Sequence, residues 1–204
     1  DGFSLLQSAV KDAATETIQK ILDLYNDPDI EEDSRFRNLL LNTTSDGFSL
    51  LQSAVKNATP EKFQIIFGLY NDPAIKKDSR FGDLLLNRTK AGYSLFHSCT
   101  KEASPEILSS IIRLYDTSNL KKPSDFNNVF NPTHHGFNCL HDAAQNKELS
   151  LDNIKQLVQW IESKVDTPHL ITMLNQKAKD WMPGERSGNP AVKKYFTNLR
   201  REYK

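Results

Sequence analysis

The sequence predicts an all-α fold, a helical solenoid built from repeats, on two observations. Residues 1–10 return unchanged as residues 46–55, and residues 1–45 match residues 46–90 without gaps at 30 of 45 positions. Within each copy, apolar residues recur at helical spacing and not in the alternation of a strand. Self-similarity at a fixed period of this size is typical of stacked units that bury their apolar faces against their neighbours.

Looser copies of the opening stretch begin near residues 91 and 135. We therefore predict a single repeat domain over residues 1–204. Its units are repeats 1–45, 46–90, 91–134 and 135–178, with a degenerate repeat and cap at 179–204. Because the chain begins inside a repeat motif, we expect it to be a fragment of a longer protein.

Each repeat opens with an Asp-Gly turn, or its equivalent, and a short first helix. In the first repeat Leu5, Leu6, Ala9 and Val10 fall on one face of this helix. The position of Ala9 stays small in the later copies, which predicts a close approach between neighbouring first helices. A helix of two or three turns is marginal alone in water, so it needs the stack.

A second, longer helix follows in each repeat. In the second repeat it starts at Thr59 and Pro60, which suit the N-cap and first-turn positions. Its apolar residues run from Phe63 to Tyr70 at i, i+3, i+4 and i+7. We expect the tyrosine ring to pack while its hydroxyl stays in water.

The rest of each repeat is predicted as a proline turn, a third short helix and a protruding loop. The stretches 42–47, 87–92 and 131–136 read as hairpin-like loops that lead to the next turn. A final helix over residues 191–203, apolar on one face and basic on the other, predicts a C-terminal cap.

Composition excludes several classes of function. Lys plus Arg and Asp plus Glu number 26 each, so no overall field favours nucleic acid. No apolar run reaches the length of a membrane span, and we expect no membrane insertion. The two cysteines form no disulfide framework, which favours a reducing, cytoplasmic location.

Two local clusters invite a chemical role and do not support one. His134, His135, Cys139 and His141 lie within eight residues, but no second ligand pair stands at suitable spacing for zinc. Cys99 lies two residues after His97, on a different side of a short helix, so the two do not form a nucleophile and base. We predict no enzyme activity, no metal and no cofactor for this chain.

Residues 136–144, Gly-Phe-Asn-Cys-Leu-His-Asp-Ala-Ala, resemble the D-G-x-T-P-L-H-x-A-A opening of ankyrin repeats, as does the opening of each other repeat. The family's proline is Leu or Cys here, and the period is 44 or 45 residues instead of about 33, so a HEAT or armadillo solenoid stays open. The near-duplicate repeats also resemble the ankyrin-repeat effectors that intracellular bacteria deliver into host cells. That resemblance implies the host cytosol as the place of action.

The resemblance to ankyrin repeats implies a non-catalytic protein-interaction scaffold, and for His141 a turn-stabilising hydrogen bond. Loop tips and exposed first-helix positions would bind the partner. The loop-tip candidates are Thr43, Thr44, Arg88, Lys90, Thr133, His134, His135, Lys177 and Lys179. The first-helix candidates are Ser8, Lys11, Ser53, Lys56, Ser98, Lys101, Asp142 and Gln145.

This set of residues is polar and leans basic, which favours an acidic or polar protein partner and not nucleic acid. We expect Arg88, Lys90 and Lys177 to be free to contact it. The alternative function is a regulatory or substrate-docking segment of an enzyme whose catalytic domain lies outside this chain.

Overall fold

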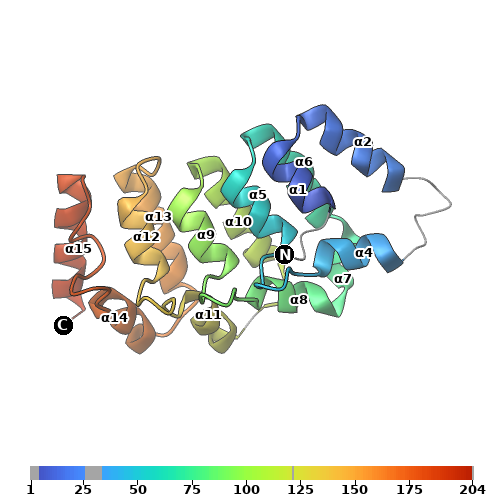
Figure 1. Ribbon diagram of the computed structural model, residues 1–204. Coiled ribbons are helices and arrows are strands. Elements are labelled where there is room, and N and C mark those ends of the chain that lie inside the picture. The colour runs from blue at the N-terminus through green and yellow to red at the C-terminus, as the bar shows by residue number, and fades with distance from the viewer. Residues whose placement is uncertain (1–4, 26–33, 121, 204) are drawn as a thin grey trace.

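The computed structural model describes residues 5–25, 34–120 and 122–203. Within these ranges the chain forms fourteen helices and no strand, which confirms the predicted all-α class (Figure 1). The turn expected at the start of the first repeat and the proline turn that begins at Asn26 lie outside the described residues.

The helices lie in three rows along an elongated array (Figure 1). The first row holds α1 (Leu5–Asp12), α5 (Leu50–Asn57), α9 (Leu95–Glu102) and α12 (Cys139–Gln145). The second row holds α2 (Thr15–Tyr25), α6 (Pro60–Tyr70), α10 (Pro105–Thr117) and α13 (Leu151–Glu162). The third row, along the lower edge of the view, holds α4 (Ser34–Leu41), α8 (Ser79–Leu86), α11 (Pro123–Phe130) and α14 (Thr167–Asn175).

Two further helices complete the described part of the chain. The helix α15 (Pro190–Glu202) packs against α13 and α14 at the C-terminal end, close to the range expected for a cap. The helix α7 (Pro73–Lys77) stands where the sequence predicted a proline turn. Asp72 caps it by accepting the Ala74 N–H at 2.7 Å, and Pro73 begins its first turn. The residues of the turn thus form one turn of helix.

Reciprocal caps hold the starts of three first-row helices, α5, α9 and α12. In α5 the Ser49 Oγ accepts the Gln52 N–H at 3.0 Å, and the Gln52 Oε1 accepts the Ser49 N–H at 3.0 Å. Both bonds satisfy N–H groups that a helix start leaves without a partner. Each helix of this row contacts the next, and Ala54 and Cys99 are fully buried there, as the small-residue pattern predicted.

The second-row helices bury the predicted apolar stripe. Phe63, Ile66, Phe67 and Tyr70 of α6 are all buried in the core. Thr59 caps this helix by accepting the Lys62 N–H at 3.4 Å, and Pro60 occupies the first turn. The amphipathic pattern therefore identified both the helix and its buried face.

The expectation of a wet tyrosine hydroxyl was wrong. Tyr70 and Tyr115 are fully buried, and burial raises the pKa of both phenols far above the ordinary value. The Tyr70 hydroxyl donates to the Leu40 carbonyl at 2.7 Å, and the Tyr115 hydroxyl donates to the Leu85 carbonyl at 2.8 Å. These carbonyls belong to the last turns of α4 and α8, where helical acceptors lack a partner along their own helix. The tyrosine thus ties its second-row helix to the third-row helix of the preceding repeat.

The loops between repeats are hairpin-like, as predicted. Isolated antiparallel bridges join Thr43 to Ser49 and Arg88 to Ser94. Neighbouring loops also bond to each other, because the Lys90 N–H donates to the Asp46 carbonyl at 2.9 Å. The loops therefore form a continuous edge next to the starts of the first-row helices.

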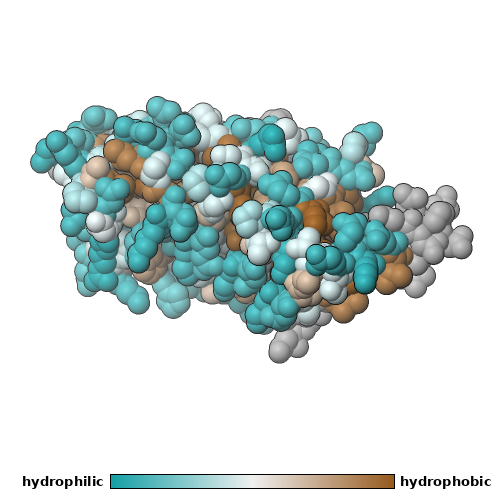
Figure 2. Space-filling model, turned by 90° about the horizontal axis from the view of Figure 1, so that it is seen from above, coloured by the Kyte–Doolittle hydropathy of each residue, from teal (hydrophilic) through white to brown (hydrophobic). Residues whose placement is uncertain are grey.

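None of the helices formed by the described residues is long and apolar enough to cross a bilayer. The face seen in Figure 2 is mainly hydrophilic, with small hydrophobic areas between the polar ones.

Candidate functional site

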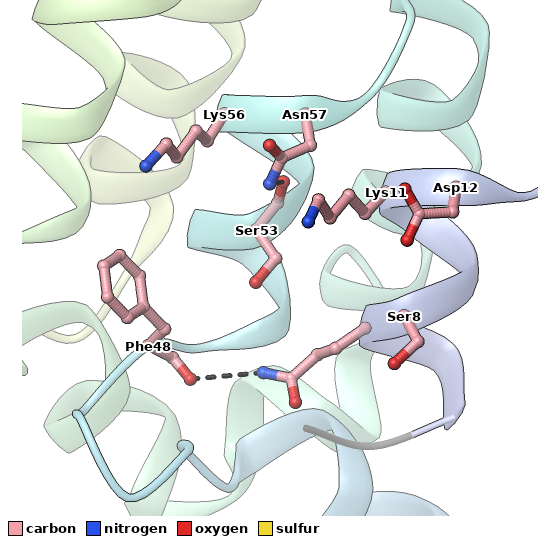
Figure 3. A pocket seen from close by; sticks show the side chains of 8 residues that line it. Ser8, Lys11, Asp12, Phe48, Ser53, Lys56 and Asn57 are labelled. Atoms are coloured by element: carbon pink, nitrogen blue, oxygen red, sulfur yellow. Dashed lines mark hydrogen bonds between the residues drawn. The ribbon is translucent and has the colours of Figure 1, made fainter. Parts of the chain in front are cut away.

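The face of the first-row helices is built on one repeated connection. The third residue of each of these helices is Gln7, Gln52, His97 or His141, and three of the four (Gln7, Gln52 and His141) bond to the loop of the next repeat. The Gln7 Nε2 donates to the Phe48 carbonyl at 3.2 Å, the dashed line in Figure 3. The Gln52 Nε2 donates to the Tyr93 carbonyl at 3.4 Å. Each bond fixes the distance between two successive first-row helices.

Histidine replaces glutamine in the third and fourth repeats, and His141 keeps the bond to the next loop. The His141 Nδ1 accepts the Asn138 N–H at 3.2 Å, and its Nε2 lies 3.3 Å from the Trp181 carbonyl. A neutral imidazole with its hydrogen on Nε2 accepts and donates in the same places as the glutamine amide. This arrangement contains the turn-stabilising bond that the resemblance implied for His141.

His97 occupies the equivalent place and is more enclosed. Its Nδ1 accepts the Ser94 N–H at 3.4 Å. It lies near the Phe137 carbonyl, but no hydrogen bond of good geometry joins its Nε2 to another described residue. Burial lowers the pKa of His97 to about 3 and the pKa of His141 to about 4, so both rings are neutral at pH 7.

The exposed face of this row carries lysines above aromatic rings. The Lys56 ammonium lies 5.9 Å from the centre of the Phe48 ring, and the Lys101 ammonium lies 5.3 Å from the centre of Tyr93. The aromatic residue directly follows the glycine of the loop turn, and the lysine stands eight residues later on the helix. The ring attracts the cation through its negative face and so orients it on the surface.

Two hollows open between neighbouring first-row helices. The first, between α1 and α5, has a volume of about 390 Å³ (Figure 3). Its lining residues are Gln7, Ser8, Lys11, Asp12, Phe48, Ser53, Lys56 and Asn57. In Figure 3 Lys11 extends from α1 toward α5, whereas Lys56 extends from α5 on the side of the Phe48 ring.

The second hollow occupies the equivalent place between α9 and α12, with a volume of about 310 Å³. Its lining residues are Tyr93, Lys101, Phe137, Asp142 and Gln145. Asp142 is only 4% exposed, and its Oδ2 accepts no hydrogen bond from any described residue. Burial raises the pKa of the Asp142 carboxyl to about 7, against the attraction of Lys101.

The structure exposes most of the predicted binding residues. The exposed loop-tip residues are Thr43, Lys90, His134, His135, Lys177 and Lys179. The exposed first-helix residues are Ser8, Lys11, Lys56, Lys101 and Gln145. Lys90 lies 3.4 Å from the Asp46 carboxylate, an exposed pair that still leaves the ammonium open to solvent. Whether a partner binds at these positions remains a prediction.

The expected exposure of five residues was wrong. The buried ones, each 4–8% exposed, are Thr44, Ser53, Ser98, Thr133 and Asp142. The Thr44 Oγ1 accepts the Phe48 N–H at 3.0 Å and so braces the loop from inside. The Ser53 Oγ donates to the Ser49 carbonyl one turn back in the same helix, at 3.1 Å. Thr44, Ser53 and Ser98 thus bond to nearby backbone, whereas the Thr133 Oγ1 and the Asp142 Oδ2 have no hydrogen-bond partner among the described residues.

Arg88 is the largest correction among the loop-tip residues. It is half-buried, and its Nη1 donates to the Asn128 and Asn131 carbonyls at 2.7 and 2.9 Å. Its Nη2 donates to the Pro132 carbonyl at 2.7 Å and to the Gly92 carbonyl. These acceptors surround the C-terminal end of α11, where the helix dipole favours a cation. The guanidinium is therefore committed to the fold and not free to contact a partner.

The residues considered as zinc ligands do not lie together in the structure. His134 and His135 are exposed on the loop, whereas Cys139 and His141 are buried in α12. The described residues contain no group of three or more His, Cys, Asp or Glu placed to hold a metal ion. Burial raises the pKa of the Cys99 thiol well above its usual value, so this thiol stays protonated.

The aromatic walls of the hollows were missed at the sequence level as binding candidates. They are Phe48, Tyr93 and Phe137, with Trp181 at the same place in the last unit, where Arg186 lies 5.3 Å from the ring centre. A usable signal was present, because an aromatic residue precedes each lysine by eight positions. That spacing crosses from a loop to a helix, so no single helical or strand period reveals it.

Comparisons of this chain with family models, with curated proteins and with solved structures find no match.

Proposed function

We propose that this chain is an ankyrin-type repeat scaffold that binds an acidic or polar protein through its first-row helices and loop tips. The observation that carries the proposal is the row of exposed lysines, Lys11, Lys56 and Lys101, at the same position of three successive repeats. Charges repeated at a fixed spacing on a rigid frame suit an extended acidic surface, since complementary charge steers encounter and sets register.

The frame itself supports this use. Hydrogen bonds from Gln7 and Gln52 to the next loop hold the lysine-bearing helices at a constant separation. A partner therefore meets charges that are already placed, which reduces the ordering cost of binding.

The test reverses the charge of the three lysines in this row. In the variant Lys11→Glu, Lys56→Glu, Lys101→Glu, we expect loss of the proteins that the parent chain captures from a lysate. The matched control is Lys20→Glu, Lys193→Glu, Lys194→Glu, which changes three exposed lysines of α2 and α15 by the same total charge. The control should capture the same proteins as the parent chain.

Circular dichroism and the melting temperature of both variants show whether the fold survives the change. Equal capture by a folded row variant and by the control would contradict the proposed surface. The captured proteins should also carry acidic segments, identified by mass spectrometry.

A further inference from the structure

Asp142 lies in the first turn of α12, and no hydrogen bond between described residues accounts for a buried carboxylate there. It is 4% exposed, its Oδ2 has no hydrogen-bond partner among the described residues, and it lines an open hollow. A buried polar atom in a native protein is almost always paired, and a buried unpaired charge is costly. The other three repeats carry serine here, as Ser8, Ser53 and Ser98. The fold therefore accepts a neutral residue at this position.

The surroundings of Asp142 suit a cation with a flat face. Tyr93 and Phe137 line the same hollow from two successive loops, and Gln145 adds a neutral amide. A guanidinium stacks on aromatic rings and pairs with a carboxylate in a planar, directional way that an ammonium does not reproduce. A volume of about 310 Å³ lies at the small end of ligand pockets and suits one long side chain.

Among the described residues, no cation pairs with Asp142. The charged groups that face Asp142 are Lys101 and Glu102, both on α9. The Lys101 ammonium lies above the Tyr93 ring and 3.8 Å from the Glu102 carboxylate. In the part of the chain that the structure describes, no lysine, arginine or histidine nitrogen lies within 4.0 Å of the Asp142 carboxylate.

Comparison with the hollow between α1 and α5 shows what has changed. That hollow has serine and lysine where the second has Asp142 and Gln145. Aspartate in place of serine adds a negative charge, and glutamine in place of lysine removes a positive charge. Both make the hollow between α9 and α12 more favourable for a cation than its counterpart.

We propose that the hollow between α9 and α12 receives an arginine side chain of the partner protein, with its guanidinium between Tyr93 and Phe137 and paired with Asp142. This rests on the proposed function, because the arginine belongs to the bound partner. The arginine contact would add one specific interaction to a binding surface that otherwise attracts the partner through its lysines. This contact would lie between the third and the fourth repeat.

The test uses a small probe, N-acetyl-L-arginine methylamide, at pH 8 with the chain of residues 1–204. Binding is followed by the amide resonances of Tyr93, Phe137 and Asp142 in NMR spectra. We expect saturable shifts, and a fall of about one unit or more in the pKa of Asp142 measured on its side-chain carbon. The citrulline analogue has the same shape and no charge, and it should produce neither effect.

Two variants keep the test independent of folding. Asp142→Ser installs the residue of the other repeats, and Asp142→Asn keeps the size while removing the charge. We expect both to weaken binding of the arginine probe by about tenfold or more, at unchanged melting temperature. If one variant folds poorly, the other decides the question.

Three results would overturn the proposal. They are the absence of saturable shifts, equal shifts with citrulline, and retained binding in folded Asp142→Asn. A pKa of Asp142 below the ordinary value of 3.8 in the free protein would do the same, because Lys101 would then occupy the site.

The arginine probe also separates this inference from the proposed function. Lys11→Glu with Lys56→Glu should impair partner capture and leave binding of the probe unchanged, because neither lysine lines this hollow. Loss of the arginine site with intact lysine-dependent capture would refute only the present inference.

Discussion

At the scale of single residues, the position of a basic side chain in the loop decides whether it bonds to the fold or stays exposed to solvent. Arg88 and Lys90 stand two residues apart in the same loop. The first donates to carbonyls around the end of α11, and the second forms an exposed pair with Asp46. The planar fork of arginine can satisfy several acceptors at once, which a lysine ammonium does less well.

Arg88→Met should therefore lower the free energy of unfolding by about 2–3 kcal/mol, because hydrogen bonds to a charged group are lost and their carbonyls lose a donor. Lys90→Met is the control and should change it by less than about 0.5 kcal/mol, as expected for an exposed pair. Urea denaturation measures both. A loss no larger for Arg88 than for Lys90 would contradict the structural role of the guanidinium.

At the scale of elements, the short helices and the loops depend on each other. Gly47 has φ +86°, and a Cβ placed there would lie 2.9 Å from the Thr89 Cα in the next loop. The turn that starts α5 thus needs a left-handed backbone and also close contact with its neighbour. Gly68 lies within α6 and has open space around it, so its lack of a side chain serves no contact.

These two glycines should respond oppositely to alanine. Gly47→Ala should destabilise the fold by more than about 1 kcal/mol, because the new methyl group meets both the positive φ and the adjacent loop. Gly68→Ala should stabilise it by about 0.5–1 kcal/mol through higher helix propensity. Thermal unfolding followed by circular dichroism distinguishes the two. Similar shifts in melting temperature would show that the loops do not pack as described.

At the scale of the whole molecule, stability rests on repeated bonds from one unit to the next. Gln7, Gln52 and His141 each reach the following loop, and Tyr70 and Tyr115 reach back to the preceding third-row helix. Connections of this kind make neighbouring units depend on each other, as in a one-dimensional array. Their chemistry also gives the molecule a specific response to acid.

The folded state should lose stability below pH 6.5 because of its buried histidines. The pKa values of His97 and His141 are about 3 and about 4 when folded, below the ordinary value of 6.5. The unfolded chain therefore binds these protons first. The contribution is complete above pH 6.5 and is lost as pH falls toward 4, on the order of 2 kcal/mol per histidine at pH 4.5.

The double variant His97→Gln, His141→Gln should remove this loss, since glutamine holds the same place in the first two repeats. Free energies of unfolding at pH 7 and pH 4.5 test the idea, with the parent chain as reference. The variant should keep more of its stability on acidification than the parent. An identical loss in both would mean that the histidines do not stay neutral in the fold.

Sequence alone determined the all-α class and the main helices of each repeat, but not α7. The duplication of residues 1–10 and the spacing from Phe63 to Tyr70 report local periodicity, and local periodicity fixes which face of a helix is buried. The predicted cap at Thr59 was equally local. These features need no knowledge of what lies across the array.

Tertiary structure alone decided which polar residues are free. The bonds of Arg88, the buried hydroxyl of Tyr70 and the unpaired carboxylate of Asp142 depend on groups brought close by the stacking of repeats. Tyr70 bonds to a residue 30 positions away along the chain, and Arg88 bonds to residues 40 to 44 positions away, so packing decides which neighbours these side chains have. The sequence therefore predicts exposure for a polar residue that contacts with the neighbouring repeat bury in the folded protein.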